Sequence, residues 1–140
     1  MKYLIRESQY RKLMEPKVLH IPSIDVFGDW ESLQKYLERR GNHPYSIGGD
    51  LDLSGTPIKS LGNLISVEGD LNLYDTPIRS LENLKSVGGF LYLDSTPIES
   101  LGNLTSVGGD LDLCFTSLSE KYTEKEIRQM VDVGGEIYLL

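Results

Sequence analysis

The chain has 140 residues, of which 39% are hydrophobic and 25% are charged, and its formal net charge is −7. These totals describe one ordinary globular domain that can bury a core without covalent cross-links. The single cysteine, Cys114, excludes an intrachain disulfide, and no apolar run approaches the roughly 18 residues of a transmembrane helix. An acidic chain repels nucleic acid and anionic membranes, so we expect direct binding to neither and favour a basic partner.

The first 47 residues differ in charge from the rest of the chain. They hold eight Lys/Arg against six Asp/Glu, a balance of +2, whereas residues 48–140 hold six against fifteen, a balance of −9. The opening MKYLIRESQYRKL is charged within its first twelve residues and has no apolar segment, so we do not interpret it as a signal peptide. It predicts a short strand, KYLI, and then a helix that begins at Ser8.

The stretch GDWESLQKYLERRG, residues 28–41, predicts a helix before the repeats. Asp29 is a natural N-cap, Trp30, Leu33 and Leu37 share one face, and Gly41 is suited to end the helix. We expect this helix to cover the N-terminal end of the structure that follows, with Trp30 in its core.

Residues 47–140 are organised by a repeat of 20 residues. IGGDLDLSGTPIKSLGNLISV (coil one, 47–67) is followed by EGDLNLYDTPIRSLENLKSV (coil two, 68–87) and GGFLYLDSTPIESLGNLTSV (coil three, 88–107). Coil four begins as GGDLDLCFTSL at residue 108. The next segment, SEKYTEKEIRQMVDV, does not follow the repeat, and the motif returns as GGEIYLL, residues 134–140. A repeat this short cannot bury its own apolar side chains, so neighbouring coils must stack into a solenoid.

Each coil combines a strand with a return segment. In the strand, apolar and polar residues alternate, which predicts a half-buried strand in a parallel sheet. The T-P-I bend ends the strand because proline cannot donate to the ladder, and the two glycines before the next strand permit a sharp backbone bend. The predicted core consists of Leu51, Leu53, Ile58, Leu61, Leu64, Val67, Leu71, Leu73, Ile78, Leu81, Leu84, Val87, Leu91, Leu93, Ile98, Leu101, Leu104, Val107, Leu111, Leu113, Val133, Ile137 and Leu139.

A second helix is predicted near the end of the chain, over about residues 123–132. Its first residues, Thr123–Glu126, form a capping box, and Ile127, Met130 and Val131 make an apolar stripe. We therefore expect a C-terminal cap helix with Met130 in its core, and a final strand at 135–140.

The repeat resembles two known families. The pattern L-x-L-x-x-T-x-I resembles the bacterial leucine-rich repeat, with threonine in the usual asparagine position, and N-L-x-S-V-G-G-x-L-x-L is similar to the receptor L-domain repeat, a right-handed β-helix. The resemblance implies a leucine-rich-repeat-like β-solenoid of 20-residue coils, with one parallel sheet and short helical caps at both ends. We divide the chain into an N-terminal strand/helix segment and cap, residues 1–46, and the solenoid, residues 47–140.

The opening MKYLIRESQYRKL resembles the openings of many uncharacterised proteins encoded by tailed phages and environmental bacteria. The resemblance implies such an origin. We expect a cytoplasmic location, in a bacterium or an infected host cell. A single cysteine fits a reducing compartment of this kind.

The sequence contains no motif for catalysis or metal binding. His20 and His43 have no partner at ligand spacing, and Cys114 has no histidine near it in the order of the repeats. Residues 50–55 imitate the start of a calcium loop, but residue 61 is leucine where that loop needs glutamate. We expect no enzyme activity, no resident metal and no cofactor.

The outward face of the strands is the candidate site. In coil three, Phe90 and Tyr92 replace the Asp or Asn residues of the first, second and fourth coils. Exposed aromatic residues surrounded by charge match the composition of interface hot spots, and acidic residues steer a basic partner. Two alternatives stay open, namely that the N-terminal segment of the chain covers both rings, or that the position tolerates drift. The predicted partner-binding residues are Asp70, Asn72, Tyr74, Phe90, Tyr92, Asp110, Asp112 and Tyr138.

We expect a non-enzymatic module that binds a protein with a basic surface, as a monomer or a weak homo-oligomer. Because the opening of the chain resembles those of phage proteins, one specific form of this function is an acidic inhibitor that occupies the nucleic-acid-binding surface of a host defence protein. Two other functions stay open. The last strand, EIYLL, could pair with another chain in a structural or self-assembling protein, or the aspartate columns could bind a cation or a small ligand.

Overall fold

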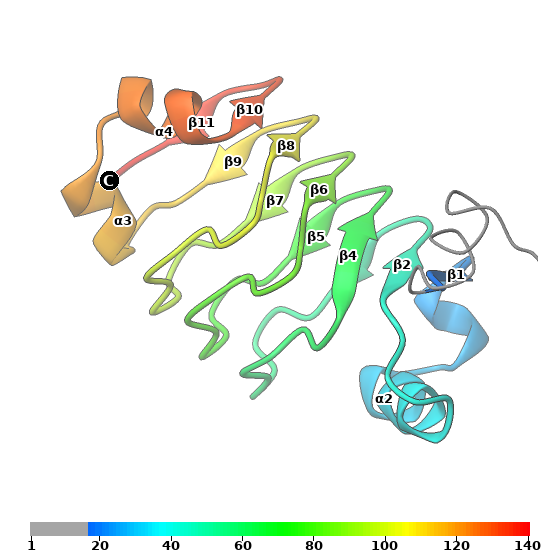
Figure 1. Ribbon diagram of the computed structural model, residues 1–140. Helices are drawn as coiled ribbons and strands as arrows, with labels where there is room; N and C mark the ends of the chain where they lie inside the picture. Colours follow the sequence, from blue (N-terminus) through cyan, green and yellow to red (C-terminus); the bar gives the residue numbers. More distant parts are fainter. Residues whose placement is uncertain (1–16) are drawn as a thin grey trace, which may run out of the picture.

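The computed structural model describes residues 17–140, in which short parallel strands form two sheets (Figure 1). The predicted strand KYLI and the helix beginning at Ser8 lie outside the described residues. Sheet A contains, in spatial order, β1 (Leu19–Ile21), β2 (Tyr45–Ile47), β4 (Leu64–Val67), β6 (Ser86–Val87), β8 (Ser106–Val107) and β10 (Asp132–Val133). Sheet B contains β3 (Leu51–Asp52), β5 (Leu71–Asn72), β7 (Leu91–Tyr92), β9 (Leu111–Asp112) and β11 (Ile137–Tyr138).

The prediction of one parallel sheet is wrong, because the end of each return segment forms a strand too. Ser66 aligns with Ser86, and Ser86 with Ser106, in sheet A. The backbone N–H of Gly88 donates to the carbonyl of Val67 at 2.8 Å, which continues this ladder beyond the strands. The sheet also extends through β2 to β1, upstream of the first coil. The result is a β-solenoid-like repeat with two sheets.

The 20-residue spacing sets the register of sheet B. Leu51 aligns with Leu71, and the column continues through Leu91 and Leu111 to Ile137. Each column of the sheet therefore holds one residue from every coil. The neighbours of a side chain above and below it are its own repeat equivalents.

The core lies between the two sheets and joins their inward side chains into one cluster. The strand leucines of sheet B and the valines that end the strands of sheet A are buried, as predicted. Ile78 and Ile98 are fully buried, whereas Ile58 and Leu139 are only partly buried. These two belong to the first coil and the final strand of the repeat, so each has a stacked coil on one side only.

The glycines before each sheet B strand have a different role from the one predicted. In coils one to four and before β11, only Gly49 of these glycines has a left-handed backbone, with φ of +74°. Instead, the glycines permit close approach between coils. A Cβ atom at Gly88 would collide with the carbonyl oxygen of Glu68, and one at Gly108 with that of Gly88. The coils therefore touch backbone to backbone at this corner.

Helices lie at both ends of the stacked strands (Figure 1). Before β2, the chain forms a 3-10 helix, η1 (Ile24–Val26), and α2 (Trp30–Arg39). The Asp29 carboxylate accepts the backbone N–H of Ser32 at 2.7 Å, and this bond lowers the pKa of Asp29. Leu33 and Leu37 are buried and Trp30 packs against the core, which confirms the predicted helix and its apolar face.

After β9, the chain forms α3 (Ser117–Lys121) and α4 (Glu124–Met130). The capping box is confirmed, because Thr123 Oγ1 accepts the backbone N–H of Glu126 and the Glu126 carboxylate accepts that of Thr123. The prediction that Met130 lies in the core is wrong, since its side chain is 47% exposed. The helix ends at Met130 and the chain turns into β10, so Ile127 fills the core there. Within residues 17–140, no helix is long and apolar enough to cross a membrane.

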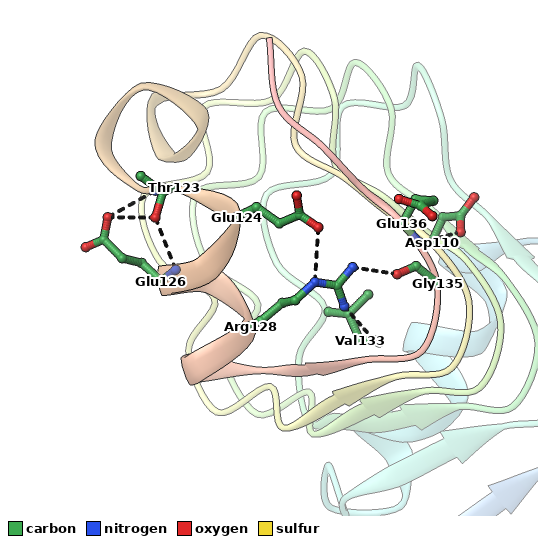
Figure 2. A network of polar contacts seen from close by, with 8 residues as sticks. All are labelled: Asp110, Thr123, Glu124, Glu126, Arg128, Val133, Gly135 and Glu136. Carbon is green, nitrogen blue, oxygen red and sulfur yellow. Dashed lines mark hydrogen bonds and ion pairs between the residues drawn. The ribbon is translucent and has the colours of Figure 1, made fainter.

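Arg128 of α4 closes the C-terminal end of sheet A. Figure 2 shows its guanidinium reaching Val133, the last residue of β10, and Gly135 just after the strand. Nη1–H donates to the carbonyl of Val133 at 2.9 Å and Nη2–H to that of Gly135 at 2.8 Å. Nε–H donates to the Glu124 carboxylate at 3.1 Å, and this ion pair holds the guanidinium in place.

Candidate interaction surface on the outer face of sheet B

Two columns of side chains cover the outer face of sheet B. The regular register places equivalent residues of successive coils one above another. The first column contains Asp50, Asp70, Phe90, Asp110 and Glu136, and the second contains Asp52, Asn72, Tyr92, Asp112 and Tyr138. The predicted partner-binding residues therefore come together on one face, with Tyr74 in the turn that follows β5.

The aspartates of the first column hydrogen-bond to the backbone of the next coil. Asp50 Oδ1 accepts the N–H of Asp70 at 2.8 Å, and Asp70 Oδ1 accepts that of Phe90 at 2.8 Å. Asp110 Oδ1 accepts the N–H of Glu136 at 2.9 Å. These bonds offset the repulsion between stacked carboxylates. The aspartates of this column thus link the coils.

The polar residues of the second column end the strands. Asp52 Oδ1 accepts the N–H of Ser54, Asn72 Oδ1 that of Tyr74 and Asp112 Oδ1 that of Cys114, each at 3.0 Å. Such local side-chain bonds to the backbone are typical of Asp and Asn at turns. The Ser54 hydroxyl and N–H both bond to the Asp52 carboxylate and lower its pKa.

Phe90 and Tyr92 occupy the positions at which coils one, two and four carry Asp or Asn. Neither aromatic ring can accept the backbone hydrogen bond that an Asp or Asn side chain accepts there. The two rings pack edge to face, with centroids 6.0 Å apart and planes at 86°. A Cβ atom at Gly109 would collide with the Phe90 ring, so the absence of a side chain there makes room for the ring on the next coil. The Phe90 side chain nevertheless remains 39% exposed.

The surface around the two rings is electrically negative. The pKa of Tyr92 is raised by partial burial and then by the nearby carboxylates Asp70, Asp110, Asp112 and Asp94. The pKa of Tyr138 is also raised, with Asp110 as the largest cause. Both tyrosines stay neutral at physiological pH, and the negative potential that raises their pKa values would attract a cationic group.

Further large apolar side chains are exposed around this face. Tyr74 and Tyr138 are about half exposed, and Phe115 and Leu140 are 72% and 79% exposed. The backbone N–H of Phe115 donates to the carbonyl of Leu140 at 3.0 Å, so these two residues are neighbours. Phe115 also has a left-handed backbone, with φ of +58°, which is unusual for a bulky residue. Neither Phe115 nor Leu140 was among the predicted partner-binding residues.

The described part of the N-terminal segment does not cover Phe90 and Tyr92. Residues 19–21 form β1, which pairs with β2 at the edge of sheet A and is therefore not laid over sheet B. Residues 1–16 lie outside the described part of the chain.

His20 has partners that the sequence did not reveal. Its Nδ1 lies 2.8 Å from Ser46 Oγ, and its Nε2 lies 3.8 Å from the Glu68 carboxylate. The parallel pairing of β1 with β2 creates this contact, which residue spacing alone does not indicate. The cluster lies on the exposed edge of sheet A.

Cys114 is poorly suited to act as a nucleophile. Burial, and then the neighbouring Asp112 and Asp94, raise the pKa of its thiol to about 11. Among residues 17–140, no group of three or more His, Cys, Asp or Glu side chains is arranged to hold a metal ion.

Comparisons of the chain with protein-family models, curated proteins and solved structures found no match.

Proposed function

We propose that the protein is a non-enzymatic binding module that recognises a protein with a basic surface through the outer face of sheet B. The contact is centred on Phe90 and Tyr92. Asp70, Asn72, Asp110 and Asp112 surround them, and Tyr74 and Tyr138 lie at the flanks.

One observation carries this proposal. At the two positions of Phe90 and Tyr92, the other coils use side-chain acceptors that bond to the backbone. Coil three forgoes both bonds, each worth about 0.5–1.5 kcal/mol, and exposes aromatic surface instead. The edge-to-face contact between the two rings restores part of the stabilisation that the missing hydrogen bonds would give. A residue pair that weakens the repeat and exposes apolar area is better explained by a partner than by folding.

The charge of the face indicates the kind of partner. Asp70, Asp94, Asp110 and Asp112 lie near the Tyr92 ring and affect its pKa. Such a surface attracts a basic partner and repels an acidic one, while the rings supply the apolar contact. Given the phage-like opening of the chain, a concrete partner is the nucleic-acid-binding surface of a host defence protein.

The proposed architecture supports this function. We propose a leucine-rich-repeat-like solenoid in which α2 caps the N-terminal end and α3 and α4 cap the C-terminal end. The buried Leu33 and Leu37 of α2, and the bonds of Arg128 to the last strand of sheet A, support these roles. Caps at the two ends of the repeat leave the outer face of sheet B open to a partner.

The repeat itself provides a matched variant for the test. Phe90→Asp combined with Tyr92→Asn gives coil three the outward residues of coil two, Asp70 and Asn72. This variant regains the backbone acceptors and makes the chain more negative by one charge. If charge alone held the partner, the variant would bind at least as well as the parent. We expect a loss of affinity of tenfold or more.

The measurement starts with the immobilised full chain in bacterial lysate and continues with the purified partner, whose dissociation constant is measured against both forms. Ser86→Ala, on the opposite sheet, is the control and should bind as the parent does. Thermal melting confirms that the variants are folded. Equal affinity of the double variant, or retention of no protein with a basic surface, would contradict the proposal.

A further inference from the structure

The aromatic pair and its carboxylates have the geometry of a site for a flat cation. The Phe90 and Tyr92 rings meet at 86° with centroids 6.0 Å apart, so an edge of one ring faces the plane of the other. Two rings at this angle form a corner that a third group can enter. The ring faces are the negative part of an aromatic quadrupole, and they attract a cation that approaches within about 6 Å.

Carboxylates stand on both sides of this corner along the solenoid. Asp70 belongs to the coil before it and Asp110 to the coil after it. Each uses Oδ1 for its bond to the backbone of the next coil. Asp110 Oδ2 lies 3.5 Å from the Tyr138 hydroxyl, a long contact that a stronger donor can replace.

These features favour arginine over lysine as the entering group. A guanidinium is planar, so it can stack on a ring while its N–H groups donate in the plane to carboxylates at the sides. It is also less strongly hydrated than an ammonium, which lowers the cost of bringing it against apolar rings. A lysine ammonium would gain the charge attraction but would lose the flat contact.

We propose that this surface anchors its partner through an arginine side chain that enters the corner between Phe90 and Tyr92, where its guanidinium stacks on the face of one ring and lies between Asp70 and Asp110. The inference rests on the proposed function, which requires only a basic partner. It adds the chemistry of the anchor, and it assigns the two rings a direct contact with the cation.

Short peptides test the anchor without knowledge of the partner. The probes are acetyl-Gly-Arg-Gly-Arg-Gly-amide and two matched peptides that carry lysine or the neutral isostere citrulline. They are titrated into the full chain at low salt while backbone amide shifts are recorded by NMR. We expect the arginine peptide to bind about three- to fivefold more tightly than the lysine peptide, with the largest shifts at residues 90–92. The citrulline peptide should show no saturable binding.

Two variants separate ring stacking from charge and from apolar bulk. Phe90→Asp with Tyr92→Asn adds negative charge, and Phe90→Leu with Tyr92→Leu keeps apolar volume without an aromatic face. In both variants the preference for the arginine peptide over the lysine peptide should be smaller than in the parent, because stacking on the rings is lost while the carboxylates remain. The anchor assignment fails if the parent does not distinguish the two peptides, or if the leucine variant retains the parent's preference. The proposed function would still stand in that case if the purified partner lost affinity for the Phe90→Asp, Tyr92→Asn variant.

Discussion

Phe115 occupies a backbone position that suits few side chains. The turn after each of the first four strands of sheet B contains one left-handed residue, which is Gly55 in coil one, Asp75 in coil two, Ser95 in coil three and Phe115 in coil four. A left-handed conformation costs an ordinary residue roughly 1–2 kcal/mol, and Gly, Asn and Asp adopt it most readily. The Phe115 ring is 72% exposed, so little packing offsets this cost.

We therefore expect Phe115→Asn to stabilise the protein by about 1 kcal/mol, because asparagine tolerates the left-handed backbone. Urea denaturation should show a higher midpoint with an unchanged slope. Asp75→Asn, at the equivalent position of coil two, is the matched control and should change the free energy of unfolding by less, because aspartate already tolerates this backbone. A loss of stability in Phe115→Asn would mean that the ring contributes more to the fold than its exposure indicates.

Cys114 should react slowly with alkylating reagents. Its pKa is raised to about 11, first by burial and then by Asp112, so the reactive thiolate is scarce at pH 7. Relative to a free cysteine with a pKa of about 8.5, the thiolate population at pH 7 is lower by roughly two orders of magnitude. The rate of iodoacetamide labelling should rise with pH up to about 11, and Asp112→Asn should accelerate labelling at neutral pH. Labelling at the rate of free cysteine would contradict this account.

The residues of the core were predictable from the sequence, but the bonds of the outer face were not. Alternation in one strand is enough to place Leu91 and Leu93 inside, and both are fully buried. The bond from the Phe90 N–H to the Asp70 carboxylate joins residues 20 positions apart and exists only because the coils stack in parallel. The aspartate columns could therefore be predicted from the repeat only as a charged surface, because nothing in the sequence indicates these bonds.

At the scale of elements, α4 completes the ladder of sheet A. Between coils, the carbonyls of Val107 and Gly109 accept the N–H groups of Gly134 and Gly135 at 2.8 Å and 2.9 Å. At the last strand, the equivalent carbonyls accept two N–H groups of Arg128 instead. One guanidinium thus takes the place of the two amides that a further coil would bring.

We expect Arg128→Ala to lower the free energy of unfolding by about 1–3 kcal/mol, because two carbonyls lose a charged donor and the ion pair with Glu124 is lost. Urea denaturation measures the change. Lys125→Ala, on the same helix, removes a charge without touching the ladder and should have an effect below about 0.5 kcal/mol. If both variants were equally stable, we would conclude that water hydrogen-bonds to the carbonyls of Val133 and Gly135 as favourably as Arg128 does.

The elements with local signals were predicted, and those that depend on stacking were missed. Asp29 and the Thr123–Glu126 box mark their helices because a cap bonds within a few residues. The strands β6 and β8 show no alternation in the sequence, because the buried residues around them, Leu84 and Val87 in coil two and Leu104 and Val107 in coil three, lie three positions apart. They exist because the coils above and below supply their hydrogen bonds.

At the scale of the whole molecule, stability depends on how closely successive coils approach. The corner at Gly88, Gly108 and Gly134 leaves no room for a Cβ atom, and the obstacle in each case is the backbone of the preceding coil. Coil two carries Glu68 at the same position of the repeat. The pairing of β2 with β4, which joins the coils there, is also the one with a register shift, between Tyr45 and Ser46. The later coils need glycine at this position, whereas coil two accommodates a side chain there.

Gly108→Ala should therefore force coils three and four apart and lower the free energy of unfolding by about 1–3 kcal/mol, as overpacking against a rigid backbone does. Glu68→Ala is the matched control, because it changes the equivalent residue where a Cβ atom already fits, and its effect should stay below about 0.5 kcal/mol. Since each coil contacts only its neighbours, hydrogen exchange should show the added opening near Gly108 before it spreads to coils one and two. Equal stability of the two variants would mean that the coil spacing adjusts freely, and the close backbone contact would then not explain the glycines.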